Sequence, residues 1–378
     1  MNTSANIRLA LPYHSPQIEN AVLSVLRSGW LVAGRHTREF EEKLCLRTGR
    51  KHAIAVSSGT GALVAAMAAL GIGPHSTVVV PAFTFPAPAR AAAFLGARVR
   101  LCDVDPETFN LSAATLGQVL DSNVSLVVGI DQFGAPCPAE SIGEMCARYG
   151  IPLLMDAACA IGARLNGRPC GSFGAVSILS FHPRKLVTTG QGGAVLTDDD
   201  AIAGAVRAFR TDGQHGQGFL KVGFDLRPSE MGCAIGAVQL DFLDEILERR
   251  QALAAHYRKL PFPQQRLIPG AVSNYQSMVV TLTALGEVPG ETEAVRFGNP
   301  QAFISYLASM GIECGPGSYH LAQLKWLQAL DNPAPTDTPN SARCHASTVA
   351  LPIHCALSDD DVKRVVEACQ QWLLQKGK

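Results

Sequence analysis

Short, continuously apolar runs alternate with segments of helical period between residues 51 and 197. Segments 60–71 and 140–150 carry apolar residues at helical spacing. Strands that are apolar on both faces and are separated by helices are typical of a parallel sheet covered on both sides. The pattern therefore predicts an α/β fold with a mostly parallel sheet. Its seven expected strands lie at residues 52–58, 77–83, 98–104, 125–133, 152–158, 175–181 and 193–197.

The pattern changes after this region. Residues 229–260 carry apolar positions at helical spacing, and shorter mixed segments follow to the end of the chain. We therefore expect two domains. The large domain, with an N-terminal arm, spans residues 1–244, and a smaller C-terminal α/β domain spans residues 245–378.

Composition and charge disfavour several classes of partner. The 378 residues are 47% hydrophobic and 17% charged, which is enough apolar material for a large core. Lys plus Arg and Asp plus Glu each number 32, so the net charge of zero gives no general attraction to nucleic acid or to an anionic membrane. No stretch approaches the ~20 apolar residues of a membrane span, and the N-terminus lacks a basic segment followed by an apolar run. A cytoplasmic location is expected.

The 11 cysteines are scattered along the chain. They form no C-x-x-C pair, and no histidine lies at metal-ligand spacing from them. We expect most of them to be reduced, small core residues, and the sequence predicts no metal site.

A first candidate for chemistry is the turn at residues 56–63, VSSGTGAL, where a predicted strand passes through small residues into a helix. Such a turn directs free backbone N–H groups and the positive end of the helix dipole at one point, which suits a phosphate. A plain tight turn explains the same residues. A dinucleotide site is disfavoured, because Val64 stands at the third glycine position of that fingerprint and no acidic residue ends the next strand.

Two further strand ends carry charged residues. Asp156 follows four apolar residues, and a carboxylate that leaves a buried strand needs a cation or a strong donor. A helix N-cap or a structural ion pair is the alternative. Lys185 lies five residues after Ser180, beside the glycine-rich stretch 190–193. It is either an ordinary solvated lysine or a shielded amine, which would be able to form a Schiff base with a carbonyl carbon.

Taken together, these features match pyridoxal phosphate. This cofactor needs a phosphate site, a carboxylate that keeps the ring nitrogen protonated, and a lysine that binds its aldehyde. The turn at 56–63 is the candidate phosphate site, Asp156 is the candidate carboxylate, and Lys185 is the candidate lysine. Pyridoxal phosphate is therefore the predicted cofactor.

Six blocks of sequence carry a resemblance to a known family, at residues 25–44, 56–74, 80–111, 156–174, 180–199 and 223–240. In these blocks, which follow one another in family order, the chain resembles the DegT/DnrJ/StrS family of sugar aminotransferases, whose members have the fold-type-I pyridoxal phosphate architecture. The resemblance implies that Lys185 is the Schiff-base lysine and that Asp156 is the partner of the pyridine nitrogen. It further implies that Gly59, Thr60 and Ser180 contact the phosphate, and that Phe85 stacks on the ring.

Two positions depart from the family pattern. Cys159 stands where the family commonly has Gln or His near the ring oxygen, three residues after Asp156. Asp225 stands where an asparagine from the neighbouring subunit usually reaches the phosphate. An ionised carboxylate would be repelled there, so we expect Arg227, two residues along, to neutralise it, or Asp225 to turn away. A helix cap ahead of residues 228–236 is the alternative for Asp225.

The resemblance implies a pyridoxal phosphate-dependent transaminase. Such an enzyme moves an amino group from an amino acid, with glutamate expected, to a keto sugar, with a nucleotide-linked sugar expected. A cyclitol or another ketone of specialised metabolism is the alternative acceptor, and a cofactor-holding regulator without turnover is the alternative function. We also expect a homodimer whose sites are completed across the interface, from the resemblance and from apolar Trp30 and Leu31 beside a glycine.

Overall fold

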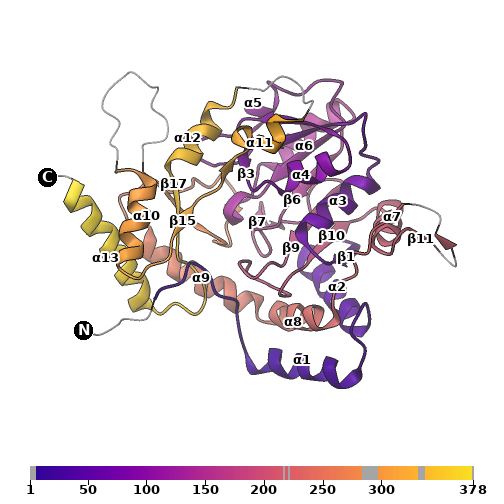
Figure 1. Cartoon of the computed structure of the whole chain (residues 1–378), viewed down its shortest axis with the longest axis horizontal. Coiled ribbons are helices and arrows are strands. Elements are labelled where there is room, and N and C mark those ends of the chain that lie inside the picture. Colours follow the sequence, from indigo (N-terminus) through magenta and orange to yellow (C-terminus); the bar gives the residue numbers. More distant parts are fainter. Residues whose placement is uncertain (1–5, 216–217, 220–221, 283–296, 331–336, 377–378) are drawn as a thin grey trace.

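The seven apolar runs form the strands of one central sheet, which occupies the larger part of the molecule (Figure 1). The computed structural model describes residues 6–215, 218–219, 222–282, 297–330 and 337–376. The strands lie in the order β1 (His52–Val56), β10 (Gly193–Thr197), β9 (Val176–Ser180), β6 (Leu153–Asp156), β5 (Leu126–Ile130), β2 (Thr77–Pro81) and β4 (Arg98–Cys102). The strands from β9 to β4 are parallel, and β10 runs antiparallel to β1 and β9. The predicted mostly parallel α/β fold is confirmed.

Helices cover both faces of this sheet. The helices of this part of the chain are α1 (Pro16–Ser28), which packs on α8, α2 (Arg35–Thr48), α3 (Gly59–Ala69), α4 (Ala87–Phe94), α5 (Ala113–Leu116), α6 (Ala139–Arg148), α7 (Asp200–Arg210), α8 (Glu230–Asp241) and α9 (Leu243–Tyr257). Buried residues of α3, α4 and α7 pack on one face, and those of α2, α5, α6 and α8 pack on the other. Because both faces are covered, the strands are mostly apolar, as the sequence pattern predicted, although the edge strand β4 also carries Arg98 and Arg100.

The helical stretch predicted at residues 229–260 is divided into α8 and α9. Phe242 lies between them, with φ −94° and ψ 7°, outside the α-helical geometry. Helix α8 begins after Ser229, whose hydroxyl accepts a hydrogen bond from the Gly232 N–H. No glycine or proline stands at the break, so the apolar spacing alone did not reveal it.

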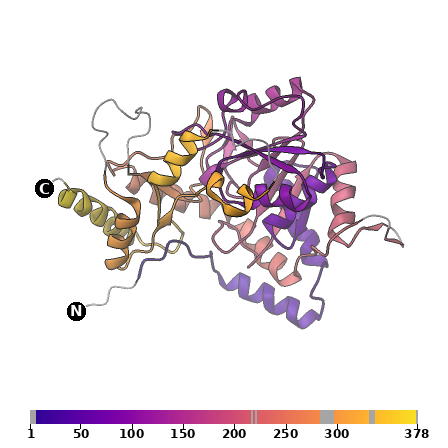
Figure 2. The ribbon, with the colours of Figure 1, turned by 45° about the horizontal axis from the view of Figure 1, so that its top comes forward.

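A smaller, C-terminal part lies beside the larger one and has a core of its own (Figures 1 and 2). Its elements are β14 (Met278–Thr281), α10 (Pro300–Ser309), β15 (Gly315–Pro316), α12 (Pro339–Ser347), β17 (Thr348–Leu351) and α13 (Asp359–Lys376). The short helix α11 (Lys325–Gln328) packs instead on the core of the larger part. Residues of α9 and Ile7 from the N-terminal segment are buried in the same core. The division at residues 244/245 stays a proposal.

Short strand pairs connect the two parts. Strand β13 (Ala271–Val272) pairs with β7 (Arg164–Leu165), which also pairs with β8 (Arg168–Pro169). Strand β16 (Tyr319–His320) pairs with β3 (Phe83–Thr84), just beyond β2. These pairings bring the C-terminal residues to the edge where the parallel strands end. A separate pair, β11 (Gln214–His215) with β12 (Gly218–Phe219), projects from the side of the molecule that is opposite the C-terminal part (Figures 1 and 2).

Among the residues that the structure describes, no helix is both long enough and apolar enough to cross a membrane. The 11 cysteines form no disulfide bond, and seven of them are buried. This agrees with the expectation that most are reduced core residues.

Candidate active site

The carboxyl ends of the parallel strands gather most of the predicted site residues at one edge of the sheet. Asp156 is the last residue of β6, and Ser180 is the last residue of the adjacent strand β9. Phe85 follows β2 and β3 at the same edge. In open α/β sheets ligands bind outside this edge, so the topology alone marks it as the candidate site.

The predicted phosphate turn lies at the beginning of α3. Gly59 is the first helical residue and Thr60, the second, is exposed. The Ser58 hydroxyl caps the helix by accepting the Gly61 N–H at 2.9 Å. A Cβ atom on Gly59 would lie 2.8 Å from Cβ and 2.9 Å from Oγ of Ser180, so only glycine fits there. The helix N-terminus and the Ser180 hydroxyl therefore face one point, which fits a phosphate.

Asp156 is buried at this edge, with 6% of its surface exposed. Its Oδ1 accepts one hydrogen bond, from the Ala158 N–H at 3.0 Å. Burial raises the pKa of the Asp156 carboxyl to about 6, although the Ala158 N–H and the positive charge of Lys185 act in the opposite direction. The carboxyl therefore retains capacity to bind a cationic N–H group.

Lys185 is half-buried and points at the turn that follows Asp156. Its Nζ donates a hydrogen bond to Sγ of Cys159 at 2.9 Å. The Lys185 N–H donates to the His182 carbonyl oxygen at 2.8 Å, which closes the turn after β9. Burial, followed by the charges of Lys185 and Arg184, lowers the pKa of His182. The structure thus brings Lys185 to the turn that holds Asp156 and Cys159, although 26 residues separate Cys159 from Lys185 in the sequence.

Phe85 presents an exposed aromatic ring, with 57% of its surface accessible. The Tyr319 ring lies against it edge to face, with the ring centroids 6.1 Å apart. The pairing of β3 with β16 carries Tyr319 from the C-terminal part to this position. Sequence analysis did not select Tyr319, and only the strand pairing reveals it.

Asp225 precedes Leu226, whose carbonyl oxygen accepts the Ser57 N–H at 2.8 Å in the predicted phosphate turn. Its carboxylate forms a two-pronged ion pair with Arg227, with N–O distances of 2.8 and 2.7 Å. The Arg227 hydrogen bonds are the main reason that the pKa of Asp225 falls to about 2. Among the described residues, no hydrogen bond or ion pair joins Asp225 to Gly59, Ser180 or Lys185. The pairing that we expected with Arg227 is present, and a role at the phosphate stays a prediction.

Three buried or half-buried polar residues at this edge were missed by sequence analysis. Asp131 follows β5 directly, as Asp156 ends β6, so the same signal of a carboxylate after an apolar run was available for it. Asn274 and Gln276 contact the turns that carry Cys159 and Lys185. They lie in a connecting segment with no apolar period, and no local signal singled them out.

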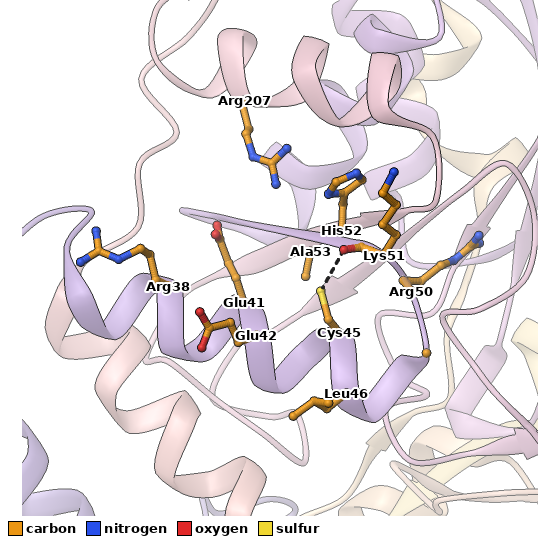
Figure 3. A pocket seen from close by; sticks show the side chains of 11 residues that line it. Arg38, Glu41, Glu42, Cys45, Leu46, Arg50, Lys51, His52, Ala53 and Arg207 are labelled. Carbon is orange, nitrogen blue, oxygen red and sulfur yellow. Dashed lines mark hydrogen bonds between the residues drawn. The ribbon is translucent and has the colours of Figure 1, made fainter.

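A hollow lies away from these residues, between α2, β1 and α7 (Figure 3). Its volume is about 670 Å³, and Arg38, Glu42 and Arg207 are among its lining residues. Lys51 and His52 on its wall are paired with Asp200 on α7. It contains none of the predicted site residues, because it adjoins the first residues of β1, whereas Ser180 lies level with the last residue of that strand.

The residues at the strand ends fit pyridoxal phosphate. The close packing of Gly59 against Ser180 sets the Ser180 hydroxyl beside the first turn of α3, and a hydroxyl next to a helix N-terminus suits the phosphate. Asp156 is a buried carboxylate with spare acceptor capacity, and Lys185 is an amine next to it. The exposed ring of Phe85 offers a stacking surface. Each need of the cofactor is met by a residue at one edge of the sheet.

Comparisons with known proteins agree with this geometry. GDP-perosamine synthase from Caulobacter vibrioides is 32% identical over 381 residues, which cover 99% of this chain and 100% of that protein. The structure of the aminotransferase TlmJ from Streptoalloteichus hindustanus gives a TM-score of 0.89 at 28% identity and covers 98% of this chain and 100% of its own. The PLP form of Spr1654 from Streptococcus pneumoniae shares the fold, with a TM-score of 0.87 at 22% identity over 98% and 99% of the two chains.

The family model extends over nearly the whole chain. The model of the DegT/DnrJ/EryC1/StrS aminotransferase family matches residues 12–370, which include both parts of the structure and all the residues at the candidate site. The chain therefore belongs to the DegT/DnrJ/EryC1/StrS aminotransferase family and is a transaminase.

Proposed function

We propose that this transaminase moves an amino group from an amino acid, with glutamate expected, to a keto sugar linked to a nucleotide. The observation that carries the proposal is the cluster of Lys185, Cys159 and Asp156 at the same sheet edge as the closely packed Gly59 and Ser180. The name of the relative from Caulobacter vibrioides, a synthase of a GDP-linked sugar, supports a nucleotide sugar as the acceptor class.

Bound pyridoxal phosphate would supply an electron-accepting ring to the reaction. Lys185 would bind the cofactor aldehyde and, once released, would move a proton between the substrate carbon and the cofactor. Asp156 would hold the proton on the ring nitrogen, because within the described part of the chain its buried carboxylate accepts a hydrogen bond only from the Ala158 N–H. Gly59, Thr60 and Ser180 would bind the phosphate, and Phe85 would cover one face of the ring.

The cofactor assignment is tested by borohydride reduction of the purified, cofactor-loaded protein. Reduction fixes pyridoxal phosphate on the amine that holds it, and peptide mapping is expected to find the adduct on Lys185. An adduct on any other lysine would overturn the assignment. The expected donor is tested by adding glutamate and following the loss of the visible absorbance of the lysine-bound cofactor.

The acceptor is tested with the aminated form of the cofactor on the protein. Keto sugar nucleotides are added one at a time, and restoration of the aldehyde form identifies the acceptor. Restoration only by a cyclitol ketone would move the acceptor class to the alternative. Failure of every amino donor to aminate the cofactor would favour a regulator without turnover.

We further propose that the protein works in the cytoplasm as a homodimer with sites completed across the interface. Trp30 and Leu31 support the dimer, because 65% and 45% of their surfaces are exposed in the single chain. Light scattering is expected to give twice the chain mass at assay concentration. An active monomer would contradict the dimer, and cell fractionation checks the location.

A further inference from the structure

One connecting segment, residues 273–277, joins the two parts of the molecule next to the candidate site. It begins after β13, which pairs with β7 in the larger part. It ends at β14, which pairs with β17 in the C-terminal part. The segment therefore crosses from one hydrogen-bonded sheet to another, and its side chains lie where the two parts meet.

Asn274 in this segment is buried and has hydrogen bonds on both ends of its amide. Its Nδ2 donates to the carbonyl oxygens of Cys159 at 2.9 Å and Ile161 at 2.8 Å. Its Oδ1 accepts the Gln276 N–H at 2.9 Å. Only 1% of the Asn274 surface is exposed. A satisfied buried amide of this kind fixes the backbone it contacts, which here is the turn after Asp156.

Gln276 binds the second turn of the site, the one that carries Lys185. Its Nε2 donates to the carbonyl oxygen of Arg184 at 3.0 Å, one residue before Lys185. Asn274 and Gln276 therefore bind the two turns that carry Cys159 and Lys185. The Lys185 Nζ atom and the Cys159 Sγ atom lie 2.9 Å apart.

The segment is itself fixed to α9. The buried side chain of Arg250 donates from Nε to the Tyr275 carbonyl oxygen at 3.0 Å and from Nη2 to the Gln276 carbonyl oxygen at 2.8 Å. A guanidinium that binds two consecutive carbonyls leaves that backbone little freedom. A continuous path of hydrogen bonds thus runs from α9 through the segment to the two turns.

We propose that Asn274 and Gln276 are positioning residues that hold Cys159 and Lys185 at their contact, so that the connecting segment sets where the lysine amine meets the cofactor. The role of Lys185 toward the cofactor rests on the proposed function. The hold on the two turns does not, and it is measurable in protein without cofactor.

The test compares two glutamine-to-glutamate variants. Because Asn274 is buried, replacing it risks unfolding the protein, and the half-buried Gln276 is the residue to change. Gln276→Glu removes the donor to Arg184 and sets a carboxylate against a carbonyl oxygen. Gln264→Glu is the matched control, since Gln264 Nε2 also donates to a backbone carbonyl, that of Tyr257 at 2.7 Å.

The first measurement is hydrogen exchange of cofactor-free protein, followed by mass spectrometry of peptides that cover residues 180–190. We expect exchange in these peptides to be about three- to tenfold faster in Gln276→Glu than in the parent, which corresponds to the loss of one hydrogen bond. Gln264→Glu should match the parent in these peptides. Equal exchange in parent and Gln276→Glu, or equal acceleration in both variants, would overturn the proposed hold.

The second measurement is cofactor capture by the same cofactor-free proteins. After mixing with pyridoxal phosphate, Gln276→Glu is expected to bind it about three- to tenfold more weakly than the parent, and Gln264→Glu to bind it as the parent does. Capture by Gln276→Glu at the parent's affinity would overturn the positioning role. If the parent itself formed no adduct on Lys185, the proposed function would fail, while the exchange measurement would still decide the hold on the turns.

Discussion

Two buried carboxylates in this molecule have opposite surroundings. Glu230, at the start of α8, has 2% of its surface exposed. It accepts hydrogen bonds from the N–H groups of Gly34, His36 and Thr37 at 2.7, 2.8 and 2.8 Å, and from the Thr37 hydroxyl. Burial alone would raise its pKa, but these donors outweigh burial and the pKa of Glu230 is lowered.

Asp156 at the sheet edge is buried to a similar degree, yet among the described residues it accepts a hydrogen bond only from the Ala158 N–H, and its pKa is raised to about 6. This difference in hydrogen-bond donors indicates a structural role for Glu230, here called the anchor, and a ligand-binding role for Asp156. Glu230 uses its acceptor capacity to join the start of α2 to the start of α8, and nothing remains for a ligand. Asp156 keeps acceptor capacity beside a lysine, at an edge where ligands bind.

Removing the charge of Asp156 should have the largest effect. Asp156→Asn is expected to lower the rate of amino transfer at least about 100-fold, because an amide cannot hold the proton on the cofactor ring nitrogen. The unfolding free energy of the cofactor-free variant should not fall, since a poorly satisfied buried carboxyl has been removed. Single-turnover kinetics with the amino donor and urea unfolding check the two expectations. Near-parental transfer would remove Asp156 from the chemistry.

A second test uses pH and a further buried carboxyl at this edge. The pKa of Asp131 is raised to about 7, chiefly by burial and also by the charge of Asp156. A carboxyl whose pKa is raised on folding stabilises the protein at low pH, and this contribution is lost as pH rises through the folded pKa. The cofactor-free protein should therefore lose stability between pH 5 and 8.

Asp131→Asn should remove about 2–3 kcal/mol of this loss between pH 5 and 8, because the amide does not ionise. Urea unfolding at several pH values measures it, with Glu230→Gln as the control. That variant should keep the parental slope in this range, because the lowered pKa of Glu230 places its titration at more acidic pH. If the unfolding free energy of Asp131→Asn fell with pH as steeply as that of the parent, Asp131 would be ionised in the folded protein over the whole range from pH 5 to 8.

The structural role of Glu230 can be tested by measuring the free energy of unfolding. Glu230→Gln is expected to lower the free energy of unfolding by about 1–3 kcal/mol, because the amide NH₂ group would face donors that the carboxylate now accepts. Transfer by the folded variant should stay within a few-fold of the parent. Equilibrium urea unfolding measures the loss. A large fall in transfer without a loss of stability would contradict the assignment of Glu230 as an anchor.

The smallest effect is expected at Cys159. Cys159→Gln should keep turnover within about threefold of the parent, because a thiol is a weak hydrogen-bonding group whose loss removes little. Steady-state kinetics check this, and a shift in the pH dependence of the cofactor absorbance is the expected accompaniment. A loss as large as that of Lys185→Ala would show a catalytic part for the thiol.

Local pattern was sufficient for much of the fold. Each of the seven strands lies within a predicted apolar run, because most side chains of a strand that is covered on both faces must be apolar. The turn at residues 56–63 and the carboxylate of Asp156 were also recognisable, since strand ends and helix starts have their own residue preferences. The neighbouring carboxylate Asp131 had the same signal and was passed over.

What the sequence determined by itself is the set of elements and the residue types at their ends. The tertiary structure decided which ends meet. The contact between Cys159 and Lys185 exists because β6 and β9 are neighbours in the sheet. The residues of these two strands do not by themselves specify the order of the strands in the sheet. Asn274 and Gln276 act on turns about 90 residues or more away in the chain, through a segment without periodicity. Periodicity encodes only how each element is buried, whereas long-range hydrogen bonds depend on how all the elements pack at once.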